Sequence, residues 1–296
     1  MREITVAAAQ FACVPDPAAN VATAERLVRE AAAQGAQIVC LQELFETQYF
    51  CTREDPRLLD LAKPLEGHPT IARFRELCRE LGVVVPVNVF ERAGRVFFNT
   101  AAIVDADGSV LGIYRKSHIP DDPGYLEKYF FSPGNTGFRV WDTRYARIGV
   151  GICWDQWYPE AARAMALRGA EMLLYPTCIG DEPVEYFETD ISEHWQLTMR
   201  GHAAANLMPV VAANRIGSEE GPFGPQTYWG QSFVAGPRGQ LVTVAPRDEE
   251  AIVTATFDLD ACEFRRREMT LFRDRRVDLY GVLLTLDGVI PGPAET

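Results

Sequence analysis

The hydrophobic positions in the first half of the chain fall into two kinds of segment that alternate with each other. Continuous apolar runs, which predict buried strands, occur at residues 4–10, 37–41, 83–90, 96–104 and 110–115. Residues 17–34 and 70–81 instead show apolar positions at helical spacing. Each of these segments also has a suitable end signal, because Asp16 can cap the first helix and Gly82 can end the second.

The second half of the chain repeats this alternation. Helical spacing occurs at residues 159–168 and 192–206, and strands are predicted at residues 147–153, 171–175, 210–213, 232–235, 240–244 and 252–257. The strands are apolar on both faces, as sheets covered on both sides require. We therefore predict an α/β protein of two similar halves, whose sheets pack face to face with helices outside, as a four-layer αββα sandwich. Residues 1–268 form one domain in this interpretation, and residues 269–296 form a C-terminal tail.

Composition narrows the class of protein. The formal net charge of −12 disfavours nucleic acids and anionic membranes as partners, because both require a basic surface. No apolar run reaches the length of a membrane-spanning helix. The seven cysteines are scattered, without a CxxC pair or zinc-binding spacing, so we expect reduced thiols in the cytoplasm, no metal and no cofactor.

Three residues with reactive side chains follow predicted strands. Glu43, Lys116 and Cys153 each come at the end of an apolar run, and ligands of open α/β sheets bind at the carboxyl ends of strands. Each residue alone is explained equally well by a structural role. Together they can form a catalytic set, in which the carboxylate takes the thiol proton, the thiolate attacks a carbonyl carbon and the ammonium stabilises the oxyanion.

The segments around these residues resemble a known family. LQELFETQYF around Glu43, YRKSHIPDDPGYLEKYFFSPGNTGF around Lys116 and GICWDQWYPE around Cys153 resemble the three signature blocks of the nitrilase superfamily, in the same order. Further likeness in HWQLTMRGHAAANLMPVVAANRIG and WGQSFVAGPRGQLV extends the resemblance over residues 4–257. Members of this superfamily are carbon–nitrogen hydrolases, and the branch that this chain resembles most is that of the N-carbamoylputrescine amidases.

The resemblance implies a role for each of these residues. Cys153 is the nucleophile, Glu43 the general base and Lys116 the oxyanion stabiliser, assisted by the backbone N–H of Trp154. Glu127, within GYLEKYFF, matches a second glutamate of the family pattern, which orients the lysine and the substrate. We also expect the base and the ammonium near Cys153 to favour its thiolate form.

The implied reaction is hydrolysis of N-carbamoylputrescine, a small cationic carbamoyl amine, to putrescine, carbon dioxide and ammonia through a covalent intermediate on the cysteine. Other N-carbamoyl amines or amino acids, linear amides and nitriles remain open as substrates. A non-catalytic or redox-thiol protein is disfavoured because all the triad positions are filled. A Cys-His peptidase is disfavoured because nothing in the sequence places a histidine beside Cys153, and Glu43 supplies a base without one.

The resemblance also implies a homodimer or a larger homo-oligomer. The helices at residues 159–168 and 192–206 carry small residues, in MALRGA and MRGHAAAN, that would allow close approach of a partner subunit. Packing on their own sheet explains these residues as well. We expect the tail at residues 269–296 to pack on the partner subunit.

The sequence also provides candidates for substrate binding. The loop CIGDEPVEYF follows a predicted strand and is the candidate site for the distal ammonium of the substrate. Glu182 is the first choice within it and Asp181 the second, although a solvated loop is the alternative interpretation. Trp154, Tyr49 and Phe130 are the candidates to shelter this ion pair from water.

We expect Glu182→Gln to raise KM for N-carbamoylputrescine about 5–150-fold, because a sheltered ion pair contributes about 1–3 kcal/mol. The kcat on an uncharged carbamoyl amine should stay nearly unchanged, since this contact binds the ground state and the transition state equally. Steady-state kinetics on both substrates measure the difference. Equal effects on the charged and the neutral substrate would show that the loop does not bind the ammonium.

Overall fold

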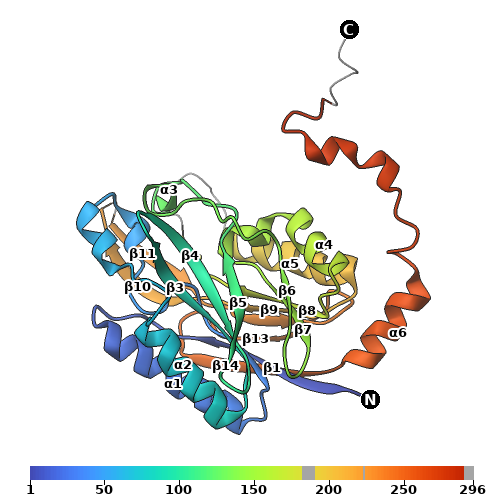
Figure 1. The fold of residues 1–296 in the computed structure, drawn as a ribbon, viewed down its shortest axis with the longest axis horizontal. Coiled ribbons are helices and arrows are strands. Elements are labelled where there is room, and N and C mark those ends of the chain that lie inside the picture. The colour runs from blue at the N-terminus through green and yellow to red at the C-terminus, as the bar shows by residue number, and fades with distance from the viewer. Residues whose placement is uncertain (182–190, 223, 290–296) are drawn as a thin grey trace.

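The computed structural model describes residues 1–181, 191–222 and 224–289. Its first β-layer contains, in spatial order, β14 (Ala251–Asp258), β1 (Glu3–Gln10), β2 (Ile38–Cys40), β3 (Val85–Ala93), β4 (Val96–Val104) and β5 (Val110–Arg115). A hydrogen bond from the N–H of Val39 to the carbonyl oxygen of Val84 (2.9 Å) joins the first three strands to the last three. Helices α1 (Pro17–Ala33) and α2 (Pro69–Leu81) cover the outer side of this layer (Figure 1).

The second β-layer contains, in spatial order, β13 (Leu241–Val244), β12 (Phe233–Ala235), β9 (Val210–Ala213), β8 (Met172–Pro176), β7 (Arg147–Val150) and β6 (Val140–Asp142). The three central strands β7, β8 and β9 run parallel. Helices α4 (Pro159–Leu167) and α5 (Ser192–Asn206) lie on its outer side (Figure 1). Parallel strands bring their carboxyl ends to the same edge of the sheet, and the candidate site lies at such an edge.

Successive residues of each central strand point alternately into two different hydrophobic cores. Val6 and Ala8 of β1 pack between the two β-layers, together with Val150 of β7, whereas Ala7 and Ala9 pack toward α1 and α2. The second layer has the same division, with a separate core between it and its own two helices. Side chains of a strand point to opposite faces, so three stacked cores require four layers. The prediction of an αββα sandwich is therefore confirmed.

Most of the predicted elements are present with small shifts at their ends. Asp16 caps α1 through a hydrogen bond from the N–H of Ala18 (2.9 Å), and Gly82 ends α2 with a left-handed φ of 68°. The strand expected at residues 147–153 is shorter and stops at Val150. Several elements were not expected, namely α3 (Glu127–Phe130), α6 (Leu259–Met269), the strand β6, the hairpin of β10 (Ile216–Gly221) and β11 (Gly224–Trp229), and the short 3-10 helices Phe50–Thr52, Pro56–Leu61, Cys153–Trp157, Val277–Leu279 and Gly281–Leu284.

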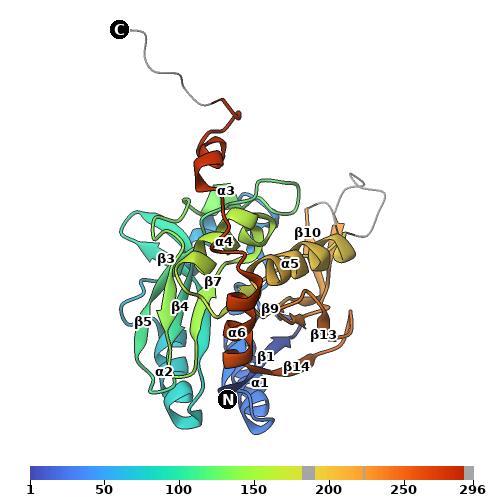
Figure 2. The same cartoon turned by 90° about the vertical axis from the view of Figure 1, so that its right-hand side faces the viewer.

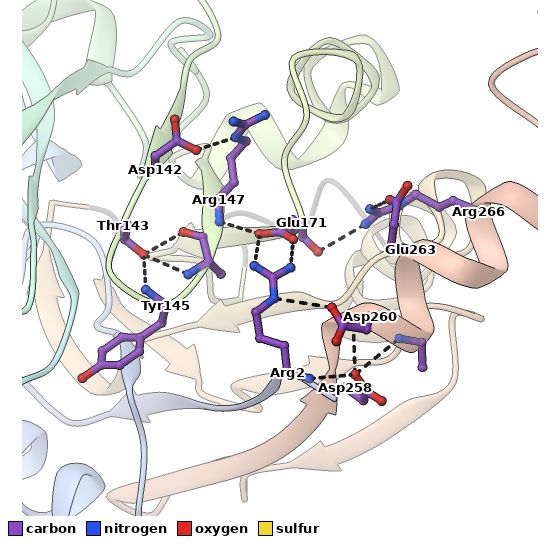
Figure 3. Close-up of polar contacts among 12 residues, drawn as sticks. Arg2, Asp142, Thr143, Tyr145, Arg147, Glu171, Asp258, Asp260, Glu263 and Arg266 are labelled. Carbon is purple, nitrogen blue, oxygen red and sulfur yellow. Dashed lines mark hydrogen bonds and ion pairs between the residues drawn. The ribbon is translucent and has the colours of Figure 1, made fainter.

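A network centred on Glu171 joins α6 to the rest of the fold (Figure 3). The Glu171 carboxylate accepts hydrogen bonds from the guanidinium of Arg2 and from the backbone N–H of Arg147, at 2.8 Å for the latter. Arg266 of α6 donates to the carbonyl oxygen of Glu171 at 3.4 Å. These residues line a hollow of about 920 Å³ between α6 and the second β-layer.

After α6 the ring of Phe272 lies 4.8 Å from the guanidinium of Arg163 on α4, and the chain beyond it extends away from the body of the molecule as far as residue 289 (Figure 2). The segment after α6 begins where Thr270 adopts a left-handed φ of 51° and ends the helix. As far as residue 289, its only helices are the two short 3-10 helices Val277–Leu279 and Gly281–Leu284. Within the three described ranges, no helix has the length and apolar character needed to cross a membrane.

Candidate active site

Glu43 lies in a buried turn, three residues after β2 ends. Its N–H donates to the carbonyl oxygen of Thr177 at the end of β8 (3.2 Å), which joins the two β-layers at this point. Leu44 adopts a left-handed φ of 48°, and its N–H donates to Asn88 Oδ1 at 2.6 Å. The buried guanidinium of Arg215 donates to the carbonyl oxygens of Glu43 and Leu44, at 3.2 and 3.0 Å. The turn is therefore held rigidly from both sides.

Lys116 follows β5 and is buried between two carboxylates. Its Nζ lies 2.9 Å from Glu43 Oε1 and 2.6 Å from Glu127 Oε2. Glu127 is the first residue of α3 and is itself buried. Its other carboxylate oxygen accepts a hydrogen bond from the hydroxyl of Tyr49 at 2.6 Å.

Cys153 is the first residue of the 3-10 helix Cys153–Trp157, three residues after β7 ends. Its φ of 41° lies in the left-handed region, which is strained for a residue with a Cβ. Its Sγ lies 3.7 Å from the carbonyl oxygen of Cys178. The N–H of Trp154 is in the first turn of this helix, where backbone N–H groups have no intrahelical acceptor.

Asp155 supports this arrangement, although the sequence did not single it out. Its buried carboxylate accepts hydrogen bonds from the N–H of Ile152 (2.9 Å) and from the hydroxyl of Tyr114 (2.7 Å). It also contacts both the N–H and the ring Nδ1 of His118, at 3.1 and 2.7 Å. One carboxylate thus joins the turn that carries Cys153 to the segment that carries Lys116. Asp155 lies between Trp154 and Gln156, and this stretch has no periodic pattern that would indicate a functional carboxylate.

The charges of the cluster shift the pKa values of its members. Burial raises the pKa of the Glu127 carboxyl to about 7, although the ammonium of Lys116 opposes this shift. Burial by itself would lower the pKa of Lys116, but the charges of Glu127 and Glu43 hold it well above its usual value. Burial, and next the charge of Glu43, raise the pKa of the Cys153 thiol well above its ordinary value. The direction of this shift is opposite to the expected stabilisation of the thiolate, so the resting residue is a thiol.

Only some of the polar atoms of the cluster have a hydrogen-bond partner among the described residues. Glu43 Oε1 accepts hydrogen bonds from Lys116 and from Asn99 Nδ2 (2.6 Å), whereas the buried Glu43 Oε2 has no hydrogen-bond partner among the described residues. An ammonium has three donor hydrogens, and the two carboxylates engage two of those on Lys116. The arrangement can therefore accept a proton through Glu43 and donate a hydrogen bond through Lys116.

The candidates for substrate binding lie in different environments. Tyr49 is part of the cluster through Glu127, and Trp154 is half-buried beside Trp157, with ring centroids 6.3 Å apart. Phe130 is buried among aromatic rings, with its centroid 5.1 Å from that of Phe50. Asp181 is exposed, and its carboxylate lies 3.9 Å from the guanidinium of Arg247. Glu182 is outside the described residues, so its assignment stays a prediction.

The chain is similar to proteins of known class over nearly its whole length. Residues 5–267 match the family model of carbon-nitrogen hydrolases. An N-carbamoylputrescine amidase of Solanum lycopersicum is 57% identical over 294 residues, which cover 98% of each chain. A citrullinase of Francisella tularensis is 47% identical over 280 residues, which cover 95% of this chain and 98% of that protein. The crystal structure of a carbon-nitrogen hydrolase from Helicobacter pylori superposes with a TM-score of 0.88 at 39% identity, covering 96% of this chain and 99% of the other.

The raised pKa of Glu127 generates a prediction for the pH dependence of turnover. As the pH falls through about 7, Glu127 binds a proton and no longer holds Lys116 as a carboxylate. We expect kcat/KM to fall on this acid side, with an apparent pKa of about 7 that belongs to the coupled groups. Glu127→Gln should remove this limb and lower the rate about 10²-fold, because Lys116 is then misplaced.

Profiles of kcat/KM against pH for the wild type and for Glu127→Gln measure this effect. Glu76→Gln is the matched control, because Glu76 is an exposed carboxylate paired with Arg73 at 3.1 Å. A Glu127→Gln variant that keeps the wild-type acid limb would rule out Glu127 as its source.

Proposed function

Since this chain belongs to the carbon–nitrogen hydrolase family of the nitrilase superfamily, we propose that it hydrolyses N-carbamoylputrescine to putrescine, carbon dioxide and ammonia. The observation that carries the chemistry is the buried cluster, in which Glu43 keeps one carboxylate oxygen without a partner among the described residues beside the ammonium of Lys116. The identity of 57% to an N-carbamoylputrescine amidase supports this substrate.

Citrulline is the second candidate, since a citrullinase is 47% identical to this chain. It differs from N-carbamoylputrescine by an α-carboxylate, which would require a cationic partner in the site. The buried arginine at the site, Arg215, is already paired with the carboxylate of Glu219 at 2.6 Å. That pairing favours a substrate without a carboxylate.

The first half of the reaction forms a covalent intermediate. Glu43 Oε2 removes the proton of the Cys153 thiol as the sulfur adds to the carbamoyl carbon. The oxyanion accepts hydrogen bonds from Lys116 and from the N–H of Trp154. Glu43 then returns the proton to the departing nitrogen, ammonia leaves, and the carbamoyl carbon remains bonded to sulfur as a thiocarbamate.

The second half of the reaction frees the enzyme. Glu43 removes a proton from water, the resulting hydroxide adds to the thiocarbamate carbon, and the same oxyanion donors act again. The carbon–sulfur bond breaks and Cys153 regains its proton. The product is the carbamic acid of putrescine, which decomposes to carbon dioxide and the free amine. One water molecule is consumed overall, and no redox change occurs.

This mechanism predicts which variants lose turnover. Cys153→Ala should release no ammonia from N-carbamoylputrescine, because no other group can form the intermediate. Lys116→Ala and Glu43→Gln should lose at least about 10²–10³-fold, the usual effect of an oxyanion donor or a positioned base. An ammonia-release assay over a panel of carbamoyl amines, citrulline and linear amides measures this. Turnover retained in Cys153→Ala would refute the nucleophile, and a strong preference for citrulline would refute the substrate.

We propose further that the functional form is a homodimer or a larger homo-oligomer. The tail carries apolar side chains that are exposed in the single chain, namely Val277, Leu279, Leu283, Leu284 and Leu286. On α5, Leu197 is 59% exposed, and a Cβ at Gly201, one turn later, would meet nothing within 4 Å. A second subunit that covers the tail and this face of α5 removes both from water.

All seven cysteines lie in the described ranges as free thiols, which supports a reducing compartment, the cytoplasm.

Leu197→Glu, or removal of the tail after Met269, should shift the protein toward monomer, because either change deprives the interface of apolar contact. Light scattering at micromolar concentration measures the mass. Val96→Glu is the matched control, because Val96 is 46% exposed at the start of β4, which belongs to the other β-layer from the one that α5 covers. A wild-type protein that is a stable and active monomer would overturn the proposal.

A further inference from the structure

The hairpin of β10 and β11 places one polar face against the candidate active site. Its register puts Gln226 opposite Glu219 and Tyr228 opposite Gly217, so the side chains of Gln226 and Tyr228 lie on the same face. Both residues are buried, although each carries polar atoms. The burial of these polar atoms must therefore be explained by the residues or the ligand that this face contacts.

Tyr228 is bracketed by the residues that support the catalytic groups. Its ring lies 6.1 Å from the ring of Tyr49, whose hydroxyl holds Glu127. On another side, the guanidinium of Arg215 lies 5.6 Å from the Tyr228 ring centroid and donates to the carbonyl oxygen of Glu43. These two contacts place Tyr228 beside one residue that holds Glu127 and one that holds the turn of Glu43.

A third contact connects Tyr228 to the nucleophile. The backbone of Tyr228 pairs with that of Gly180, and a Cβ at Gly180 would lie only 2.2 Å from the carbonyl oxygen of Thr227. Two residues before Gly180, the carbonyl oxygen of Cys178 faces the Sγ of Cys153. Tyr228 thus lies between the segment that contacts the nucleophile and the residue that holds Glu127.

The hydroxyl of Tyr228 is buried and has no hydrogen-bond partner within the described part of the chain. A buried hydroxyl without a partner destabilises a protein, so such groups usually have a ligand or a water molecule to bond. Tyr49 donates to Glu127 and Arg215 is paired with Glu219, but Arg215 Nε and the side-chain amide of Gln226 also lack partners within the described part of the chain. Burial also raises the pKa of Tyr228 well above its usual value, so the hydroxyl is neutral.

We propose that the Tyr228 hydroxyl accepts a hydrogen bond from the N–H that joins the carbamoyl group to the carbon chain of the substrate. This inference rests on the proposed function and specifies how the site distinguishes a ureide from a carboxamide, which has a methylene group at that position. The adjacent guanidinium of Arg215 disfavours a cation at this hydroxyl, so it takes the neutral N–H and not the distal ammonium. The carbonyl oxygen already has donors in Lys116 and Trp154.

The test uses two pairs of substrates that differ only by N–H against CH₂. N-carbamoylputrescine is matched by 6-aminohexanamide, and N-butylurea is matched by hexanamide. For Tyr228→Phe we expect kcat/KM on both ureides to fall about 10–100-fold, while the values for the two amides stay within about twofold. The free variant should be as thermostable as the wild type or more so, because the change removes a buried hydroxyl that lacks a partner.

Tyr175→Phe is the matched control, because Tyr175 also has a buried hydroxyl without a partner in the described ranges but packs beneath α5 with Trp195. It should leave the ratio of ureide to amide turnover unchanged. Equal losses on ureides and amides in Tyr228→Phe would overturn the proposal, because they would place the hydroxyl on the carbonyl oxygen. A loss confined to N-carbamoylputrescine would overturn it as well, because the hydroxyl would then contact the ammonium.

The two proposals can fail separately. A wild-type protein that prefers N-butylurea or another ureide to N-carbamoylputrescine contradicts the proposed substrate, yet the comparison of N-butylurea with hexanamide still tests Tyr228. Unchanged kcat/KM of Tyr228→Phe on every ureide that the wild type hydrolyses contradicts the role of Tyr228 and leaves the proposed substrate intact.

Discussion

The ammonium of Lys116, buried between the carboxylates of Glu43 and Glu127, is the interaction on which the rest of the site depends. Its side chain has no exposed surface, and removal of an ion from water costs several kcal/mol even after relaxation. One carboxylate would neutralise this charge, but the second adds an excess negative charge. Burial, and to a lesser extent the charge of Glu43, raise the pKa of the Glu127 carboxyl to about 7, so protonation of Glu127 can remove the excess charge near neutral pH. Glu43 therefore keeps an oxygen that can act as a base.

The fold makes this cluster possible by bringing together strand ends from both β-layers. Glu43 and Lys116 come from the first layer, after β2 and β5, and Cys153 comes from the second, after β7. Arg215 and Asp155 hold the turns that carry Glu43 and Cys153. Left-handed residues in such turns cost about 1–3 kcal/mol each, and the buried polar contacts around them offset that strain.

Most of the strands and the helices α1, α2, α4 and α5 could be predicted, because burial on both sides of a sheet appears in the sequence as continuous apolar runs and burial on one side of a helix as helical spacing. The helix α6 could not, because its residues are mostly polar on every side and its position depends on contacts with Glu171 and other distant residues. The role of Asp155 could not be predicted for a similar reason, since its partners Tyr114 and His118 lie far from it in sequence. The state of the thiol was misjudged because the ammonium is visible in the sequence, whereas the burial that outweighs it is a property of the fold.

The central claim is that Cys153 rests as a neutral thiol and loses its proton to Glu43 only as it attacks. The ultraviolet absorbance of thiolate, titrated in the free wild-type enzyme and in Cys153→Ser, measures this directly. The account predicts that the two proteins have the same thiolate absorbance at neutral pH, because burial raises the pKa of Cys153. A thiolate signal at neutral pH that is present in the wild type and lost in Cys153→Ser would contradict it.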